Sequence, residues 1–109
     1  MKIICVGLNY RNHAAEMGRP LPPEPMIFLK PDSALLKKNK PFFIPDFSTN
    51  MQYEAEIVLR ISKLGKGIAA RYAKRYYDAL TVGIDFTARD LQHRFSQAGH
   101  PWELSKTFD

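Results

Sequence analysis

The chain has 109 residues, 45% of them hydrophobic and 12% aromatic, with a formal net charge of +5. This composition excludes a disordered chain, and the length suits one domain with a modest core. No stretch approaches the roughly 20 apolar residues that span a membrane, and only four apolar residues follow Lys2, so we expect no secretion signal. We therefore expect a soluble, cytoplasmic protein with no membrane partner. The single cysteine, Cys5, lies in an apolar run, which predicts a buried structural thiol.

Much of the excess positive charge falls in two short segments, 37–40 and 71–75. Scattered lysines and arginines are common on protein surfaces, and no base-reading motif accompanies them here. We therefore expect two solvated faces and no nucleic-acid partner.

The first half of the chain predicts short elements separated by prolines. The apolar run 2–6 predicts a strand, and weak helical spacing over 9–17 predicts a helix. Segment 18–25 contains four prolines in eight residues and must be an extended loop. Apolar residues resume at 26–29, which predicts a second strand. A brief apolar run at 42–44, flanked by two prolines, suits the edge of a sheet better than its centre.

The best strand pattern in the chain covers 53–62. Side chains of a strand alternate between its two faces, so one face receives only apolar residues. These are Tyr53, Ala55, Ile57, Leu59 and Ile61. The opposite face carries Glu54 and Glu56 and ends in Arg60 and Ser62. Beyond this strand, glycines at 65 and 67 predict a turn.

Two further elements follow that turn. Residues 69–78 predict a helix with alanine and tyrosine at helical spacing, and 79–85 predict another strand. Thr87 and Asp90 then match the [ST]-x-x-[DE] start signal of a helix that would run to about Gln97.

Asp85 would therefore lie where a strand gives way to a helix. Such junctions often carry functional residues, because the strand is rigid and the helix start is electropositive. The alternative is that Asp85 only caps backbone N–H groups at the start of the helix.

Glu54 and Glu56 are the most informative pair of residues in the sequence. On one face of a strand their Cα atoms lie about 6.6 Å apart, and two like charges aimed at one spot repel each other. A cation between them relieves this repulsion, and hard carboxylate oxygens favour Mg²⁺, Mn²⁺ or Ca²⁺ over zinc. The alternative is a solvent-facing edge strand with ordinary surface charges.

Several motifs occur together and in order along the chain. They are Gly7-Leu8-Asn9-Tyr10-Arg11-Asn12-His13, Phe28-Leu29-Lys30-Pro31, Tyr53-Glu54-Ala55-Glu56, Asp85-Phe86-Thr87-Ala88-Arg89-Asp90-Leu91-Gln92, and Pro101-Trp102 followed by Ser105-Lys106. Together they resemble the fumarylacetoacetate hydrolase family, in its acylpyruvate hydrolase and oxaloacetate decarboxylase branch. The resemblance implies an α+β, β-rich fold, a mixed β-sandwich or roll with short helices, and a homodimeric enzyme.

The resemblance also implies roles for single residues. Glu54, Glu56 and Asp85 would bind one divalent ion, usually Mg²⁺ or Mn²⁺, and leave positions open for a substrate that chelates through two oxygens. Lys106 and Arg89 are the natural cations to balance three carboxylates. We also expect Lys106 to lie in an apolar terminal strand, where a lysine needs an anionic partner.

His13 and Glu16 are spaced to meet on one face of a helix. In the resembling enzymes such a pair activates water for attack on the substrate carbonyl, and C–C cleavage then releases pyruvate or a similar acid. By analogy the pair lies on a segment that closes over the substrate. The alternative is an ordinary loop histidine that makes one hydrogen bond.

The same site would decarboxylate oxaloacetate without a water nucleophile, because loss of CO₂ leaves the same stabilised enolate. By resemblance, Gln92 and Lys106 would orient the carboxyl group that leaves, and Arg89 would hold the other. The alternatives are a surface ion pair between Arg89 and Asp90 and an exposed helix position for Gln92.

Two other functions remain open at this point. The same family contains isomerases of unsaturated dicarboxylic acids, and a non-catalytic fragment or basic binding module is a candidate of another class. Members of the family continue well past the position of Asp109 into further strands and a Gly-Thr-Pro segment. We therefore expect residues 1–109 to be the N-terminal portion of a single catalytic domain whose C-terminal part is missing.

Overall fold

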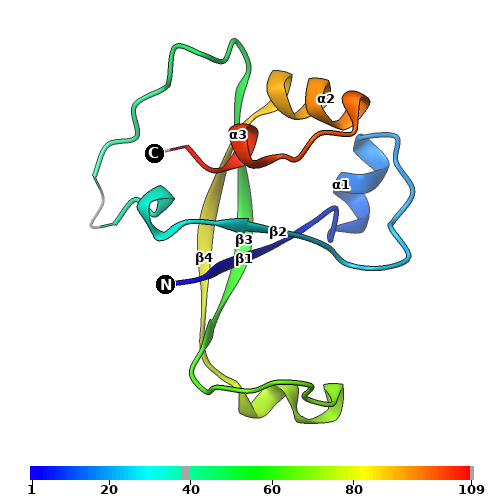
Figure 1. Ribbon diagram of the computed structural model, residues 1–109, viewed down its shortest axis with the longest axis vertical. Helices are drawn as coiled ribbons and strands as arrows, with labels where there is room; N and C mark the ends of the chain where they lie inside the picture. The colour runs from blue at the N-terminus through cyan, green and yellow to red at the C-terminus, as the bar shows by residue number, and fades with distance from the viewer. Residues whose placement is uncertain (38–39, 109) are drawn as a thin grey trace. The chain divides into compact units, whose positions relative to one another are not determined.

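A computed structural model describes residues 1–37 and 40–108 of the chain (Figure 1). The chain divides into two compact units: the first comprises Met1–Met51 and Thr87–Asp109, and the second comprises Gln52–Phe86. Within the described residues, no helix combines the length and the apolar character needed to cross a membrane.

The first unit contains an antiparallel sheet of two strands, β1 (Ile3–Gly7) and β2 (Met26–Lys30). Both strands were predicted from their apolar runs. Phe28 of β2 meets the ring of Trp102 edge-on, with ring centroids 6.0 Å apart. A Cβ added at Gly7 would lie 3.0 Å from the same indole ring. The absence of a side chain at Gly7 therefore lets β1 pass close to Trp102.

Helices α1 (Arg11–Glu16), α2 (Arg89–Ala98) and α3 (Glu103–Lys106) and the 3₁₀ turn η1 (Asp32–Ala34) complete the first unit. Helix α2 ends at Gly99, whose left-handed φ of 68° is the usual glycine stop signal. All buried residues among those described belong to this unit. They are Ala14, Thr87, Ala88, Arg89, Gln92, Phe95, Ser105 and Lys106.

The second unit is built on a hairpin of two long strands, β3 (Met51–Ile61) and β4 (Tyr77–Ala88). The backbone N–H of Ser62 donates to the carbonyl of Tyr76 at 2.8 Å, so the strands leave the connection side by side and run antiparallel. The predicted turn is present, with Gly67 at a φ of 62°. Residues 52–86 include no buried residue, and one face of the hairpin exposes its apolar side chains.

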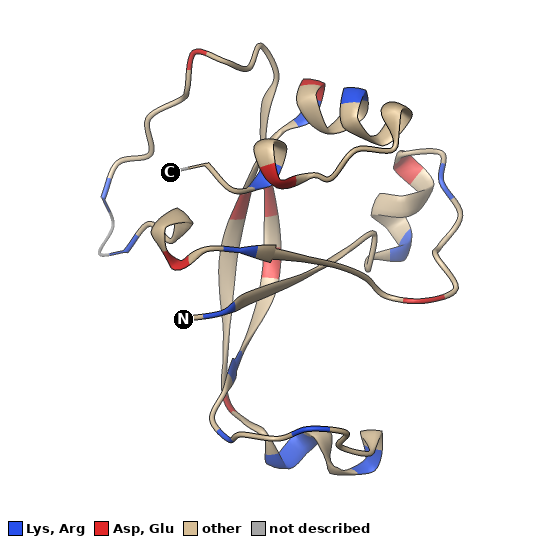
Figure 2. Cartoon of the chain, viewed as in Figure 1, with Lys and Arg blue, Asp and Glu red and all other residues tan. Residues whose placement is uncertain are grey.

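The connection between these strands contains the 3₁₀ helix η2 (Ala70–Arg75), where the sequence predicted a longer α-helix. Arg71 and Arg75 both lie over the ring of Tyr72, at 4.9 and 5.0 Å from its centroid. Figure 2 shows the basic residues of this connection, and all residues of segment 71–75 are exposed as predicted. In the other basic segment, Lys37 and Lys40 are exposed, and positions 38–39 lie outside the described residues.

Besides the α-helix expected over 69–78, four local predictions were wrong. Residues 42–44 form no strand, because Pro41 and Pro45 on either side lack the N–H donors of a sheet ladder. The terminal segment with Lys106 is the short helix α3 and not a strand. Cys5 is half-buried rather than buried, since it lies in a sheet of only two strands.

The fourth wrong prediction concerns the start of α2. Strand β4 continues to Ala88, so Asp85 lies inside the strand and not at its junction with the helix. Helix α2 begins at Arg89 with Ala88 as its N-cap and without a side-chain capping bond. Thr87 therefore does not cap the helix; its hydroxyl accepts a hydrogen bond from Lys106 instead.

Candidate metal centre

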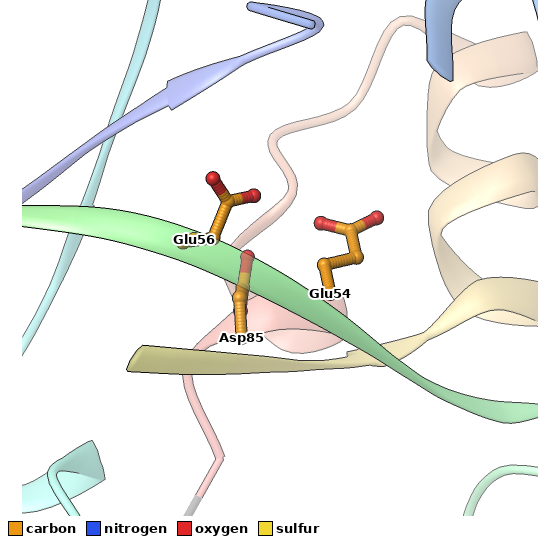
Figure 3. A group of neighbouring side chains, drawn as sticks. All are labelled: Glu54, Glu56 and Asp85. Atoms are coloured by element: carbon orange, nitrogen blue, oxygen red, sulfur yellow. The ribbon is translucent and has the colours of Figure 1, made fainter. Parts of the chain in front are cut away.

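Three carboxylates converge on one side of the β3–β4 hairpin. Glu54 and Glu56 project from β3 and Asp85 projects from the neighbouring β4 (Figure 3). One oxygen atom from each residue can be chosen so that all three lie within 4.8 Å of one another. The carboxylates are half-buried, and Oδ1 of Asp85 is shielded from solvent.

The strand geometry explains this cluster. Alternation along β3 places Glu54 and Glu56 on the same face, as predicted from their spacing. Asp85 joins them from the adjacent strand, β4. The sequence predicted Asp85 as the third carboxylate, although it placed the residue at the end of its strand.

The arrangement fits one divalent cation. Ligand oxygens lie about 2.0 to 2.6 Å from Mg²⁺ or Ca²⁺, so oxygens on opposite sides of one ion are about 4 to 5 Å apart. The separation limit of 4.8 Å in this cluster falls in that range. Carboxylate oxygens are also the donors that these hard ions prefer. Three clustered anions repel one another unless positive charge is present nearby, which favours the same interpretation.

Lys106 is the most unusual basic residue of the first unit, because its side chain is almost completely buried. The residue is 3% exposed, and its Nζ donates a 2.7 Å hydrogen bond to Oγ1 of Thr87, which is itself buried. The ammonium group lies 5.7 Å from the ring centroid of Phe28, and the carbonyl of Lys106 accepts a hydrogen bond from Lys30. The contacts with Thr87 and Phe28 restrict the orientation of the side chain.

Arg89 and Gln92 are the two polar residues of α2 that are buried. Nη1 of Arg89 donates to Oε1 of Gln92 across one helical turn. The surface alternatives considered for these residues were therefore wrong, since Asp90 binds other partners and Gln92 is not exposed. A buried guanidinium with a fixed neighbour is suited to hold a carboxylate group.

His13 and Glu16 lie on α1, one helical turn apart. Nδ1 of His13 is 3.9 Å from Oε2 of Glu16, which is within ion-pair range but longer than a hydrogen bond. The helix and the shared face were predicted from the sequence. The side chain of His13 is 33% exposed and that of Glu16 is 77% exposed, so solvent reaches the pair.

Two features of the structure were not predicted from the sequence. The bond between Lys106 and Thr87 joins residues 19 positions apart, and no local pattern signals it. Asp90 accepts hydrogen bonds from Ser48 Oγ at 2.6 Å and from the backbone and hydroxyl of Thr49 at 3.0 and 3.2 Å. These bonds lower the pKa of Asp90 to about 2, and the bond from Ser48 has the largest effect.

The chain belongs to the fumarylacetoacetate hydrolase family. A sequence profile described as fumarylacetoacetate (FAA) hydrolase C-terminal matches residues 2–109. The α+β, β-rich fold class is also confirmed, because solved structures of the same family match the chain closely. The family indicated by the sequence motifs is therefore confirmed.

Similar proteins include the mitochondrial oxaloacetate tautomerase fahd-1 of Caenorhabditis elegans, which is 40% identical over 99% of this chain and 50% of the relative. Oxaloacetate tautomerase YcgM of Escherichia coli is 35% identical over 99% of the chain and 49% of the relative. Fumarylpyruvate hydrolase from Pseudomonas aeruginosa, solved in complex with Mn²⁺ and pyruvate, has a TM-score of 0.92 and 38% identity, covering 100% of this chain and 49% of that one. The chain thus spans about half the length of these proteins.

Proposed function

We propose that this chain carries the divalent-metal site of an enzyme that hydrolyses acylpyruvates, decarboxylates oxaloacetate, or does both. The observation that carries the proposal is the convergence of Glu54, Glu56 and Asp85 within 4.8 Å. The Pseudomonas relative, whose structure contains Mn²⁺ and pyruvate, supports both the kind of ion and the kind of acid.

The three carboxylates would hold the ion, which we propose to be Mg²⁺ or Mn²⁺, with Ca²⁺ as a further candidate. Such an ion, when bound, stabilises the negative charge that develops on the oxygens of a 2-oxo acid. The three carboxylates carry one more negative charge than the ion neutralises, and we propose that Lys106 and Arg89 supply the balance. The burial of Lys106 supports this role, because a buried ammonium is costly without polar or anionic neighbours.

We further propose that Arg89 and Gln92 bind the carboxylate groups of the substrate. The guanidinium offers paired donors that match the two oxygens of a carboxylate, and the bond to Gln92 restricts its orientation. Gln92 and Lys106 would orient the carboxyl group that leaves as CO₂ during decarboxylation.

In acylpyruvate hydrolysis, His13 would take a proton from water while Glu16 orients the imidazole. The water oxygen then bonds to the acyl carbonyl carbon, the adjacent C–C bond breaks, and its electron pair forms the enolate of pyruvate. That enolate takes up a proton and leaves as pyruvate, together with the carboxylic acid from the acyl group. The solvent contact of His13 is consistent with access to water.

A second candidate is the interconversion of the keto and enol forms of oxaloacetate. The names of the Caenorhabditis and Escherichia relatives favour it. This reaction moves a proton between carbon and oxygen through the same kind of enolate, so it needs an acid or base but no attacking water. The isomerase and the non-catalytic or basic binding module remain alternatives, and a homodimer in the cytoplasm remains a prediction.

The test uses the protein in the full length that its gene encodes. We expect cleavage of an acylpyruvate or loss of CO₂ from oxaloacetate, abolished by EDTA and restored by Mn²⁺ or Mg²⁺. Glu54→Ala should remove the activity, and the control Asp78→Asn, which changes a carboxylate of the same hairpin outside the cluster, should retain it. Full activity in the chelated enzyme would contradict the proposal.

Product analysis then separates the candidate reactions. Hydrolysis releases two acids, decarboxylation releases CO₂, and tautomerisation or isomerisation releases no second molecule. His13→Ala should reduce hydrolysis more than decarboxylation, because only hydrolysis uses a water nucleophile. Equal losses in both reactions would remove the water-activating role from His13.

A further inference from the structure

Asp90 joins the two chain segments that flank the β3–β4 hairpin. Its carboxylate receives hydrogen bonds from Ser48 Oγ at 2.6 Å and from Thr49 N and Oγ1 at 3.0 and 3.2 Å. Ser48 Oγ also accepts a 3.3 Å bond from the backbone of Asn50. Arg89, next to Asp90, donates its backbone N–H to the carbonyl of Asn50 at 2.9 Å. We call these five residues the strand-end clamp.

The strand-end clamp sets a register for the hairpin. The bond from the N–H of Arg89 to the carbonyl of Asn50 lies just beyond the strands, where β3 begins at Met51 and β4 ends at Ala88, so these bounds place Met51 opposite Ala88 and Asn50 opposite Arg89. Four residues forward from Asn50 along β3 is Glu54. Four residues back from Arg89 along β4 is Asp85. In the register of the clamp, Glu54 therefore lies opposite Asp85, which agrees with the presence of both residues in the carboxylate cluster.

The other end of the hairpin has a different register. There the N–H of Ser62 donates to the carbonyl of Tyr76 at 2.8 Å, just beyond the end of β3 at Ile61 and the start of β4 at Tyr77. One residue inside each strand end, Arg60 binds Asp78 at 2.7 and 3.1 Å. Six more residues along each strand from Arg60 and Asp78 would bring Glu54 opposite Ile84, and Asp85 would then face the other side.

The two ends thus differ by one residue, which means that β4 contains one residue more than β3 between them, as in a β-bulge. A shift of one residue moves every side chain of a strand to the opposite face. The position of Asp85 beside Glu54 and Glu56 therefore follows the register of the strand-end clamp and not that of the connection at η2.

From this geometry we infer that Asp90 is a positioning residue of the metal site: its carboxylate anchors Ser48 and Thr49 so that β3 and β4 present their three carboxylates on the same side. The inference rests on the metal site of the proposed function. Asp90 itself would touch neither the ion nor the substrate.

The test measures Mn²⁺ affinity by titration calorimetry, without substrate, in the wild type, Asp90→Ala and Asp90→Asn, with urea unfolding to confirm that each variant is folded. We expect Asp90→Ala to weaken Mn²⁺ binding by about 10-fold to 100-fold, the range for groups that orient metal ligands. Asp90→Asn should be weakened less, because the amide keeps one acceptor oxygen. Ser48→Ala removes one donor and leaves Asp90 in place, and it should weaken Mn²⁺ binding by about 3-fold to 10-fold. This variant replaces Asp90→Ala in the test if Asp90→Ala does not fold.

Asp78→Asn is the matched control, since it removes a carboxylate that holds the opposite end of the same hairpin. We expect it to leave Mn²⁺ affinity within about 2-fold, because exposed ion pairs contribute little. A folded Asp90→Ala or Ser48→Ala protein that binds Mn²⁺ as tightly as the wild type would overturn the inference. So would an equal loss in Asp78→Asn.

A second measurement does not depend on the ion. Cross-strand backbone NOEs between Glu54 and Asp85 report the register directly, and we expect them in the wild type and Asp78→Asn but reduced or absent in Asp90→Ala. Unchanged NOEs in Asp90→Ala would overturn the inference even if the affinity fell. A wild type that shows these NOEs but binds no Mn²⁺ would overturn the proposed function instead, and the role of Asp90 toward the metal with it.

Discussion

The two units of the chain differ in what holds them together. In the first unit, the buried residues come from α1, α2, α3 and the end of β4, and they include the polar group around Lys106. The second unit has no buried residue, yet it contains all three carboxylates of the candidate metal centre. An isolated two-stranded hairpin is at best marginally stable in water. The residues proposed to bind the ion thus lie on an element with little packing of its own.

Several apolar residues of the hairpin are exposed, in contrast to the buried apolar residues of the first unit. Tyr53, Ile57, Leu80 and Val82 are 76%, 62%, 67% and 70% exposed. In a packed sheet such residues would form the core face, as their alternation along the strands predicts. The relatives of this chain are about twice its length, so a longer polypeptide of this family has further residues available for such packing.

Truncation of a large apolar side chain in each unit gives the largest expected difference. Phe95→Ala in α2 should cost about 3 to 5 kcal/mol, because the side chain is buried and its removal leaves a cavity. Leu80→Ala in β4 should cost less than about 0.5 kcal/mol, because that residue is already exposed to solvent. Urea unfolding of both variants checks the comparison. Equal losses would show that the hairpin face is packed in solution.

Replacement of one metal ligand should separate binding from stability. Glu56→Gln should weaken Mn²⁺ binding by more than about 100-fold, since groups that only support a ligand already contribute 10-fold to 100-fold. With EDTA present, the same change should leave the protein equally stable or slightly more stable, because it removes one of three repelling charges. Titration calorimetry and urea unfolding measure the two effects. A loss of stability without the ion would mean that Glu56 has a structural role.

Acid should affect the strand-end clamp. The pKa of Asp90 is lowered from 3.8 to about 2, chiefly by the hydrogen bond from Ser48, so the ionised form stabilises the folded protein above about pH 4. That contribution is lost as the pH falls from about 4 through about 2. Circular dichroism during acid titration should show a smaller loss of stability over this window in Asp90→Asn than in the wild type. Identical acid profiles would contradict a stabilising contribution of the ionised Asp90.

The smallest effect is expected at the opposite end of the hairpin. The hydrogen bonds with Arg60 lower the pKa of Asp78, but both side chains are largely exposed. Asp78→Asn should slightly increase hydrogen exchange near residues 60–62 at low salt, and about 1 M NaCl should cancel the difference through screening. A difference in hydrogen exchange that persists at high salt would contradict the view that the pair of Arg60 and Asp78 contributes less to the hairpin than the strand-end clamp does.

Much of the local structure could be predicted from the sequence because local rules decide it. The strands β1, β2 and β3 follow from apolar runs and alternation, and α2 ends at Gly99 for the reason that glycines commonly end helices. The predicted start of α2 was wrong because the hydroxyl of Thr87 accepts a hydrogen bond from the distant Lys106 instead of capping the helix. The α-helix expected over 69–78 was wrong because the short connection forms a 3₁₀ turn.

The sequence by itself determined that Glu54 and Glu56 share a face, since alternation along a strand depends only on their spacing. It also determined the family, because the motifs occur in order along the chain. Only the tertiary structure decided how Asp85 meets the glutamates, since it depends on the pairing of β3 with β4, two segments that are distant in sequence. Likewise, only the fold decided that Lys106 is buried against Thr87, because burial depends on segments that are distant in sequence.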